Sequence, residues 1–132
     1  MKVLFICQGN VARSQMAEAY YNHFTKANDA KSAGVSETSP KKYPKIIDEV
    51  ILVMKEDGID ISDNKIKTVT KEMVVESDKI FILCEKELCP AFLLNSNKTI
   101  FIPVDDPYQT SIDNFRGIRD IIKSKIYSLI KK

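Results

Sequence analysis

VLFICQGNVARS, residues 3–14, joins a short apolar run to a polar loop and to the start of a helix. Val3 to Cys7 has the length and composition of a buried strand, and Gly9-Asn10 ends it. From Ser14 onward, apolar residues recur at steps of three and four, which is the spacing of one apolar helix face. The stretch therefore predicts a strand, a loop at its carboxyl end and a helix that follows directly.

The remainder of the chain repeats this alternation of apolar runs and periodic apolar positions. The predicted strands are residues 32–34, 79–84 and 99–104, and the predicted helices are residues 46–54, 70–75, a short one near Pro90, and 115–129. Strands that alternate with helices favour a parallel sheet that is covered on both faces. We therefore predict one α/β domain over residues 1–132, with a four-stranded parallel sheet flanked by helices on both faces.

The composition is that of a globular chain with one core. Hydrophobic residues make up 44% of the 132 residues, and Lys+Arg 20 against Asp+Glu 18 leave a formal net charge of +2. This balance gives no electrostatic basis for nucleic-acid or membrane binding, so neither partner is expected. Three cysteines make no disulfide framework in such a chain, and the N-terminal apolar run is too short for a signal peptide. We expect a cytoplasmic protein with reduced cysteines.

The loop after Cys7 has the parts of a nucleophilic oxyanion site. A loop that runs from the carboxyl end of a strand into a helix directs several backbone N–H groups at one point, where an anion is attracted. The same donors would stabilise the Cys7 thiolate, and the Ser14 hydroxyl can donate to the sulfur. Arg13 can hold two oxygens of a tetrahedral anion, and Gly9 and Asn10 tolerate left-handed conformations. These residues indicate nucleophilic catalysis on an oxyanion.

A carboxyl group can join this site from the last predicted strand. Asp105-Asp106-Pro107 follows that strand, and the carboxyl ends of parallel strands meet at one edge of the sheet. A group that departs from a cysteine adduct needs a proton, which a carboxylic acid can supply. We select Asp106 as this acid, with Asp105 as the second choice.

The order of these motifs resembles a known family. The Cys7-to-Ser14 loop after an N-terminal strand, Ser32-Ala33-Gly34, Gly58-Ile59-Asp60-Ile61-Ser62 and a late Asp-Pro-Tyr are similar to the low-molecular-weight protein tyrosine phosphatases and the thioredoxin-coupled arsenate reductases. The resemblance implies flavodoxin-like layering and a mechanism without metal or cofactor. It makes Cys7 the nucleophile, Arg13 the oxyanion ligand and Asp106 the acid. The substrate-binding residues that it implies are Gln8, Gly9, Asn10, Val11, Ala12, Ser14 and Tyr108.

The first of the two implied activities is a phosphatase. Such an enzyme would hydrolyse a phosphotyrosine or aryl phosphate monoester, of a protein or a small molecule, through a cysteinyl-phosphate. Tyr108 resembles the aromatic residue that flanks aryl substrates in the phosphatases, and Tyr43, in a variable loop of the family, is a candidate for substrate choice. A phosphate carrier with a similar fold is a third possibility, which Arg13 and Asp106 disfavour because a carrier must not hydrolyse its own phosphocysteine.

The alternative activity is a thioredoxin-coupled arsenate reductase that uses Cys7, Cys84 and Cys89. The doubled Asp105-Asp106 and the Cys89-Pro90 pair resemble the reductases, in which a second cysteine attacks the arsenate adduct and a third resolves the disulfide. On a continuous helix, residues five apart have Cα atoms about 8.6 Å apart, beyond the roughly 7 Å limit for a disulfide. Cys84 at the end of an apolar strand is also typical of a packed core thiol. We therefore place the phosphatase first.

Overall fold

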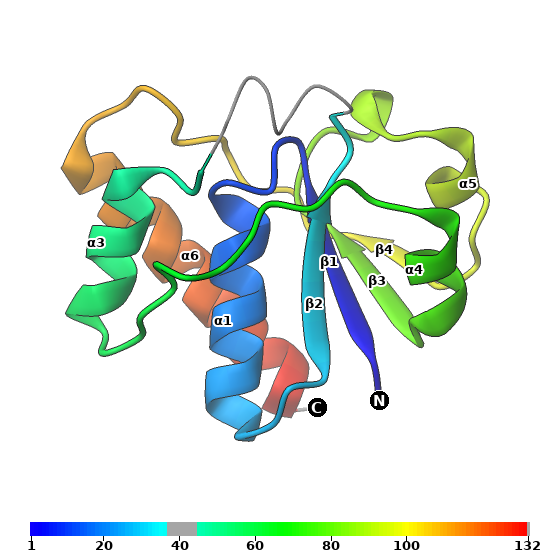
Figure 1. Ribbon diagram of the computed structural model, residues 1–132, viewed down its shortest axis with the longest axis horizontal. Helices are drawn as coiled ribbons and strands as arrows, with labels where there is room; N and C mark the ends of the chain where they lie inside the picture. Colours follow the sequence, from blue (N-terminus) through cyan, green and yellow to red (C-terminus); the bar gives the residue numbers. More distant parts are fainter. Residues whose placement is uncertain (37–44, 132) are drawn as a thin grey trace.

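The structure, a computed structural model, describes residues 1–36 and 45–131 and is built around four parallel strands in the order β2-β1-β3-β4 (Figure 1). The strands are β1 (Val3–Cys7), β2 (Ala30–Gly34), β3 (Lys79–Ile82) and β4 (Thr99–Phe101). The helices are α1 (Arg13–Thr25), α3 (Asp48–Glu56), α4 (Lys71–Glu76), η1 (Lys86–Leu88), α5 (Ala91–Leu94) and α6 (Ile112–Lys131). The predicted fold class is confirmed, whereas Tyr43 lies outside the described residues.

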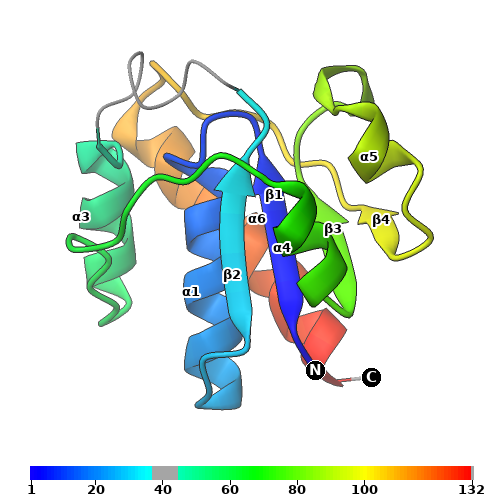
Figure 2. The same cartoon turned by 45° about the vertical axis from the view of Figure 1, so that its right-hand side comes forward.

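The side chains of β1 alternate between the two faces of the sheet and so divide the core in two. Val3 and Phe5 pack with buried residues of α1, α3 and α6, and Phe5 stacks on Phe81 of β3 with 5.6 Å between ring centroids. Leu4 and Ile6 face the other way and pack with residues of α4 and α5. Figure 2 shows the two groups of helices on opposite sides of the strands. Both faces are therefore covered, as a parallel sheet requires.

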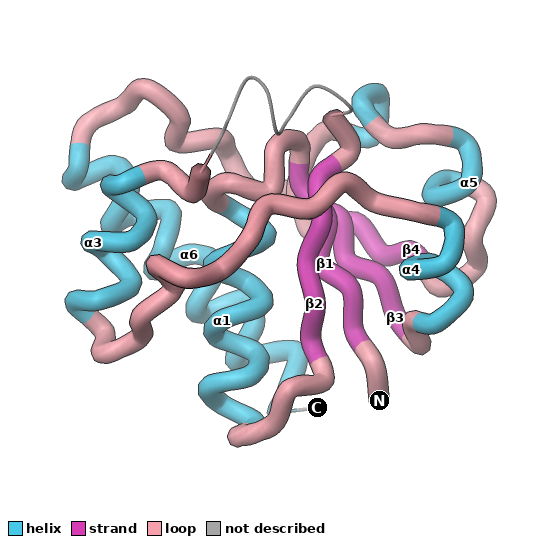
Figure 3. The backbone as a smooth tube through the Cα atoms, in the orientation of Figure 1, coloured by secondary structure: helices cyan, strands magenta, loops and turns pink. Residues whose placement is uncertain are grey.

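The last two strands, β3 and β4, are shorter than the sequence predicts. β3 stops at Ile82, since the next carbonyl, that of Leu83, accepts from the Val104 N–H at 3.0 Å and the Arg13 guanidinium at 3.3 Å. β4 ends at Phe101, and the N–H of the next residue, Ile102, still donates to the Ile82 carbonyl at 2.9 Å. The described parts of the segments that follow the four strands lie at one edge of the sheet (Figure 3).

The outer edge of β2 is occupied at two of its positions. The Asn22 side chain from α1 accepts from the Ala30 N–H at 2.9 Å and donates to the Ala30 carbonyl at 3.1 Å. At the other end of the strand, Gly34 donates to the Lys67 carbonyl and accepts from the Val69 N–H, both at 2.8 Å. The segment before α4 therefore lies against the carboxyl end of β2.

Ionic and polar contacts join α1, α3 and α6 on the side away from the loops. The Tyr20 hydroxyl donates to Asp57 at 2.6 Å, and Lys123 donates to the same carboxylate at 3.1 Å. Arg116 and Arg119 pair with carboxylates of α6 and also with Glu56 of α3. Among the described residues, no helix is long and apolar enough to span a bilayer.

The Tyr20 hydrogen bond makes stability depend on pH, because this hydroxyl and then Lys123 hold the pKa of Asp57 below its usual range. A lowered folded-state pKa stabilises the fold above the unfolded value of about 3.9, and the contribution is lost as pH falls through the folded value. Tyr20→Phe is therefore expected to lower the free energy of unfolding by about 1 kcal/mol at pH 7 and by less at pH 3. Urea denaturation at both pH values measures this, with Tyr127→Phe at an exposed site as control; an equal loss at both would contradict it.

Candidate active site

The loop of residues 8–12, called the Cys7 loop below, curves around the sulfur of Cys7. The Asn10 N–H donates to this sulfur at 3.3 Å, and the Ser14 hydroxyl lies 2.9 Å from it. The N-cap residue of α1, Ala12, makes no side-chain cap hydrogen bond, and the N–H groups at a helix N-terminus attract an anion. Of the two residues that tolerate a left-handed conformation here, Asn10 adopts it, with φ of 56°, and Gly9 does not.

Asn10 anchors the Cys7 loop to the protein interior, and its side chain is completely buried. Its amide nitrogen donates to Ser14 at 2.8 Å and to Ser32 of β2 at 3.0 Å. Its amide oxygen accepts from the Lys67 N–H at 2.9 Å and from Gln15 at 3.1 Å. A buried amide with all these partners fixes the loop against one helix, one strand and one more distant segment.

Gly34 has a role at the site that the sequence did not reveal. A Cβ atom placed on Gly34 would lie 2.8 Å from the carbonyl oxygen of Gln8, 2.9 Å from the backbone of Gly9 and 3.0 Å from the Asn10 nitrogen. The Cys7 loop therefore packs directly on β2, at a distance that only glycine permits. The signal was present in Ser32-Ala33-Gly34, which the sequence used only as a mark of resemblance.

Arg13 is fixed before any ligand binds, and its side chain is only 3% exposed. One terminal nitrogen, Nη1, donates to the carbonyls of Val104 at 2.9 Å and Leu83 at 3.3 Å, which follow β4 and β3. The other, Nη2, lies 3.7 Å from Oδ2 of Asp106. A buried guanidinium held in this way places a permanent positive charge beside the Cys7 loop.

One pocket collects most of the predicted site residues. It is lined by Cys7, Gln8, Gly9, Val11, Ala12, Arg13, Asp106 and Tyr108. Asn10 and Ser14 lie beneath the loop and do not line the pocket, and Asp105, the second choice for the acid, is not among the lining residues either. The pocket therefore brings together a thiol, a guanidinium and a carboxyl group. These are the functional groups that nucleophilic attack on an oxyanion uses.

Cys84 and Cys89 are brought together by a segment that is not a continuous helix. Between them lies only the three-residue η1, and both side chains belong to the same buried core cluster, where the Cys89 thiol donates to the Glu85 carbonyl at 3.8 Å. The distance argument made for a continuous helix therefore does not apply. Burial raises the pKa of both thiols, and for Cys84 the neighbouring thiols of Cys89 and Cys7 raise it further. All three cysteines are buried and unpaired by disulfides.

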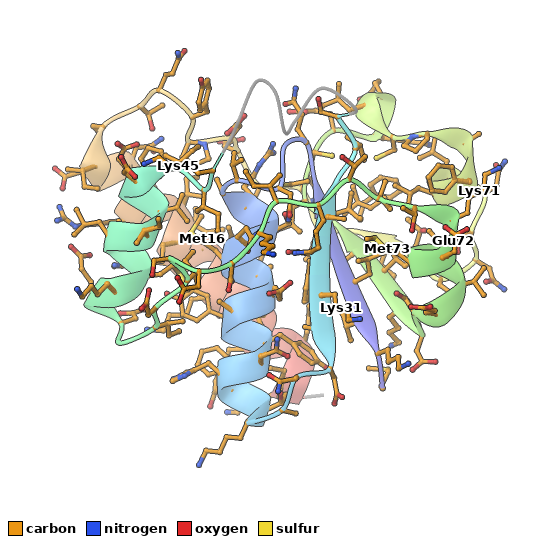
Figure 4. The ribbon with its side chains drawn as sticks, in the orientation of Figure 1. Met16, Lys31, Lys45, Lys71, Glu72 and Met73 are labelled. Carbon is orange, nitrogen blue, oxygen red and sulfur yellow. The ribbon has the colours of Figure 1, made fainter. Side chains whose placement is uncertain are left out.

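A second cavity, of about 550 Å³, lies along β2 and holds none of the predicted site residues. Lys31 of β2 and Met73 of α4 are two of its lining residues and are labelled in Figure 4. Both basic and acidic side chains line it, so its charge favours neither an anion nor a cation as ligand.

Comparison with known proteins places these features in context. The profile of the family described as low molecular weight phosphotyrosine protein phosphatase matches residues 2–132. The chain is 31% identical over 127 residues to an arsenate reductase of Brevibacillus brevis, covering 94% of the chain and 90% of the relative. It is 34% identical over 127 residues to arsenate reductase 2 of Staphylococcus saprophyticus, covering 94% and 92%.

Solved structures show the same fold. The low molecular weight protein tyrosine phosphatase of T. tengcongensis superposes with a TM-score of 0.84 at 27% identity, covering 99% of this chain and 98% of that chain. The YwlE arginine phosphatase of Geobacillus stearothermophilus superposes with a TM-score of 0.84 at 22% identity, covering 98% and 90%.

The close approach of Gly34 to the Cys7 loop predicts a loss of oxyanion binding in Gly34→Ala. The added methyl group must displace the loop backbone, so we expect phosphate affinity to fall by about tenfold or more and the free energy of unfolding to fall by about 1–3 kcal/mol.

Gly117→Ala is the matched control, because a Cβ there meets nothing within 4 Å and the residue lies inside α6. It should keep phosphate affinity and gain about 0.5–1 kcal/mol. Calorimetric titration and urea denaturation measure both, and unchanged affinity in Gly34→Ala would contradict the role.

Proposed function

The chain belongs to the low molecular weight phosphotyrosine protein phosphatase family, and we propose that within this family it reduces arsenate, with Cys84 and Cys89 supplying the two electrons. Family membership makes it an enzyme, either a phosphatase or an arsenate reductase. The observation that carries the proposal is the placement of Cys84 and Cys89 in one buried cluster, where Cys84 follows β3, the strand next to β1. The arsenate reductases at 30–34% identity support the same activity.

The first step of the proposed reaction takes place in the pocket. The Cys7 thiolate, which the Ser14 hydroxyl and the Asn10 N–H stabilise, attacks arsenic, so that an S–As bond forms and one As–O bond breaks. Arg13 and the N–H groups of the Cys7 loop hold the remaining oxygens. The carboxyl of Asp106 donates a proton to the departing oxygen, which leaves as water.

The next two steps move electrons between sulfur atoms. The Cys84 thiolate attacks the sulfur of Cys7, so that an S–S bond forms, the S–As bond breaks and its electron pair stays on arsenic, which leaves as arsenite. The Cys89 thiolate then attacks the sulfur of Cys84 and releases Cys7 as a thiolate. The product is a Cys84–Cys89 disulfide, which a dithiol protein of the thioredoxin class returns to two thiols. Such a partner places the protein in a reducing compartment, the cytoplasm.

Burial raises the pKa values of the Cys84 and Cys89 thiols, and the proposed reaction needs each of them as a thiolate. Because burial keeps both thiols protonated at rest, Cys84 must lose a proton before it can attack. The fraction of thiolate rises with pH, so arsenate reduction should accelerate toward alkaline pH until the first step becomes limiting. Hydrolysis of a phosphate ester should do the opposite, since it needs Asp106 protonated to release the leaving group.

Hydrolysis of aryl phosphates is the second candidate, and Tyr108 favours it. Its ring is 37% exposed and lines the pocket beside Asp106, where it can flank the aromatic ring of a substrate. The phosphatase of T. tengcongensis, at 27% identity, also supports this reading. The first step would then be attack on phosphorus, water would resolve the adduct, and Cys84 and Cys89 would only fill the core.

Cys7→Ser should separate binding from reaction in either case. The backbone donors and Arg13 remain, so phosphate should bind within about threefold of the native affinity. Without the thiolate, turnover of arsenate and of an aryl phosphate should fall by more than about 10³-fold. Calorimetric titration with phosphate and steady-state assays measure the two quantities. Turnover at the native rate would exclude Cys7 as the nucleophile.

Arsenate-dependent NADPH oxidation, with thioredoxin and thioredoxin reductase present, tests the proposal itself. We expect steady oxidation by the native protein and its loss in Cys84→Ser and Cys89→Ser. Aryl phosphate hydrolysis in the same variants is the control, because it uses neither thiol and shows that the pocket is intact. If the native protein hydrolyses an aryl phosphate and oxidises no NADPH, the chain is a phosphatase and the reductase proposal is wrong.

A further inference from the structure

The two oxygens of the Asp106 carboxyl group have different surroundings. Oδ1 accepts the Tyr108 N–H at 3.0 Å, whereas Oδ2 lies 3.7 Å from Nη2 of Arg13 at the pocket. The side chain is 40% exposed, so surrounding packing does not hold it in one orientation. The position of the oxygen that faces the pocket therefore depends on the backbone of the loop that follows Asp106.

That loop is tied to α6 through one hydroxyl group. Thr110 donates to the carbonyl of Pro107, the residue after Asp106, through its Oγ1 and also through its N–H at 3.0 Å. The same Oγ1 accepts from the side-chain amide of Asn114 at 2.9 Å. Asn114 lies in the first turn of α6, and the next residue, Phe115, is fully buried in the core. The contacts thus run without a break from the core to the residue after Asp106.

The loop needs such a restraint because its backbone is strained between these anchors. Gln109 has φ of 61°, a left-handed conformation that a residue other than glycine adopts at some cost. Strained backbone persists only where surrounding contacts hold it. The two bonds from Thr110 to Pro107 close the turn across Gln109 and so supply that restraint.

We propose that Thr110 is a positioning residue for Asp106, with Asn114 orienting the Thr110 hydroxyl. Thr110 touches no substrate and acts by holding the Pro107 carbonyl, which keeps Oδ1 on the Tyr108 N–H and Oδ2 toward the pocket. The inference rests on the proposed function only in taking Asp106 as the acid, a role that both candidate activities share.

Thr110→Val removes the hydroxyl and keeps the shape, and Thr110→Ser restores the hydroxyl. We expect Thr110→Val to lower kcat for phenyl phosphate, a poor leaving group, by about three- to tenfold. For an aryl phosphate with a nitro-substituted leaving group, which departs without a proton, kcat should change little, and phosphate affinity should be retained. Thr110→Ser should restore the native rates, and Asn114→Ala should lower kcat in the same direction by a smaller factor.

Two further measurements distinguish positioning from a general structural effect. In an Asp106→Asn background, Thr110→Val should cause no further loss of kcat, since the hydroxyl acts through the acid. Amide exchange at Tyr108 should be several-fold faster in Thr110→Val and native in Thr110→Ser, which needs no turnover at all. An equal loss with both leaving groups, an equal loss in both backgrounds, or unchanged exchange at Tyr108 would overturn the proposal. Absence of arsenate reduction would instead count against the proposed function alone.

Discussion

A fully buried asparagine is the constraint on which the site depends. Asn10 has a left-handed backbone, donates its N–H to the Cys7 sulfur and uses its side chain to hold Ser14 and Ser32. No water replaces a lost hydrogen-bond partner in the interior, so a buried amide that loses one is left desolvated and unsatisfied, which costs free energy. The hydrogen bonds of Asn10 therefore stabilise one another. The shape of the anion cradle is therefore determined by the core of the domain and not by the ligand.

Arg13 connects this cradle to the other two functional segments. Its Nη1 binds the carbonyl of Leu83, the residue before Cys84, and the carbonyl of Val104, two residues before Asp106. The guanidinium that faces the anion thus also fixes the ends of β3 and β4. This explains how Cys84, Asp106 and Cys7, which are far apart in sequence, lie near one edge of the sheet, where parallel strands place ligands.

The sequence was sufficient for features that depend on local patterns. Apolar runs located β1, β3 and β4, Ser32-Ala33-Gly34 marked the end of β2, and the spacing from Cys7 to Ser14 indicated an anion-binding loop. It was insufficient where distant segments meet: the contact of Gly34 with the Cys7 loop and the burial of Cys84 and Cys89 in one core cluster both depend on tertiary packing. The helix assumed between these cysteines is replaced by a short 3-10 turn, because Pro90 starts a separate helix at its own N-cap position.

The covered edge of β2 affects how copies of the chain meet in solution. A strand with free N–H and C=O groups is a template on which another chain can add a strand, and this is a common route to aggregation. Here the Asn22 amide imitates a neighbouring strand at Ala30, and the segment around Lys67 does so at Gly34. An incoming chain would have to displace both before it could pair. The contacts at the two ends of β2 thus oppose the addition of a strand at this edge of the sheet.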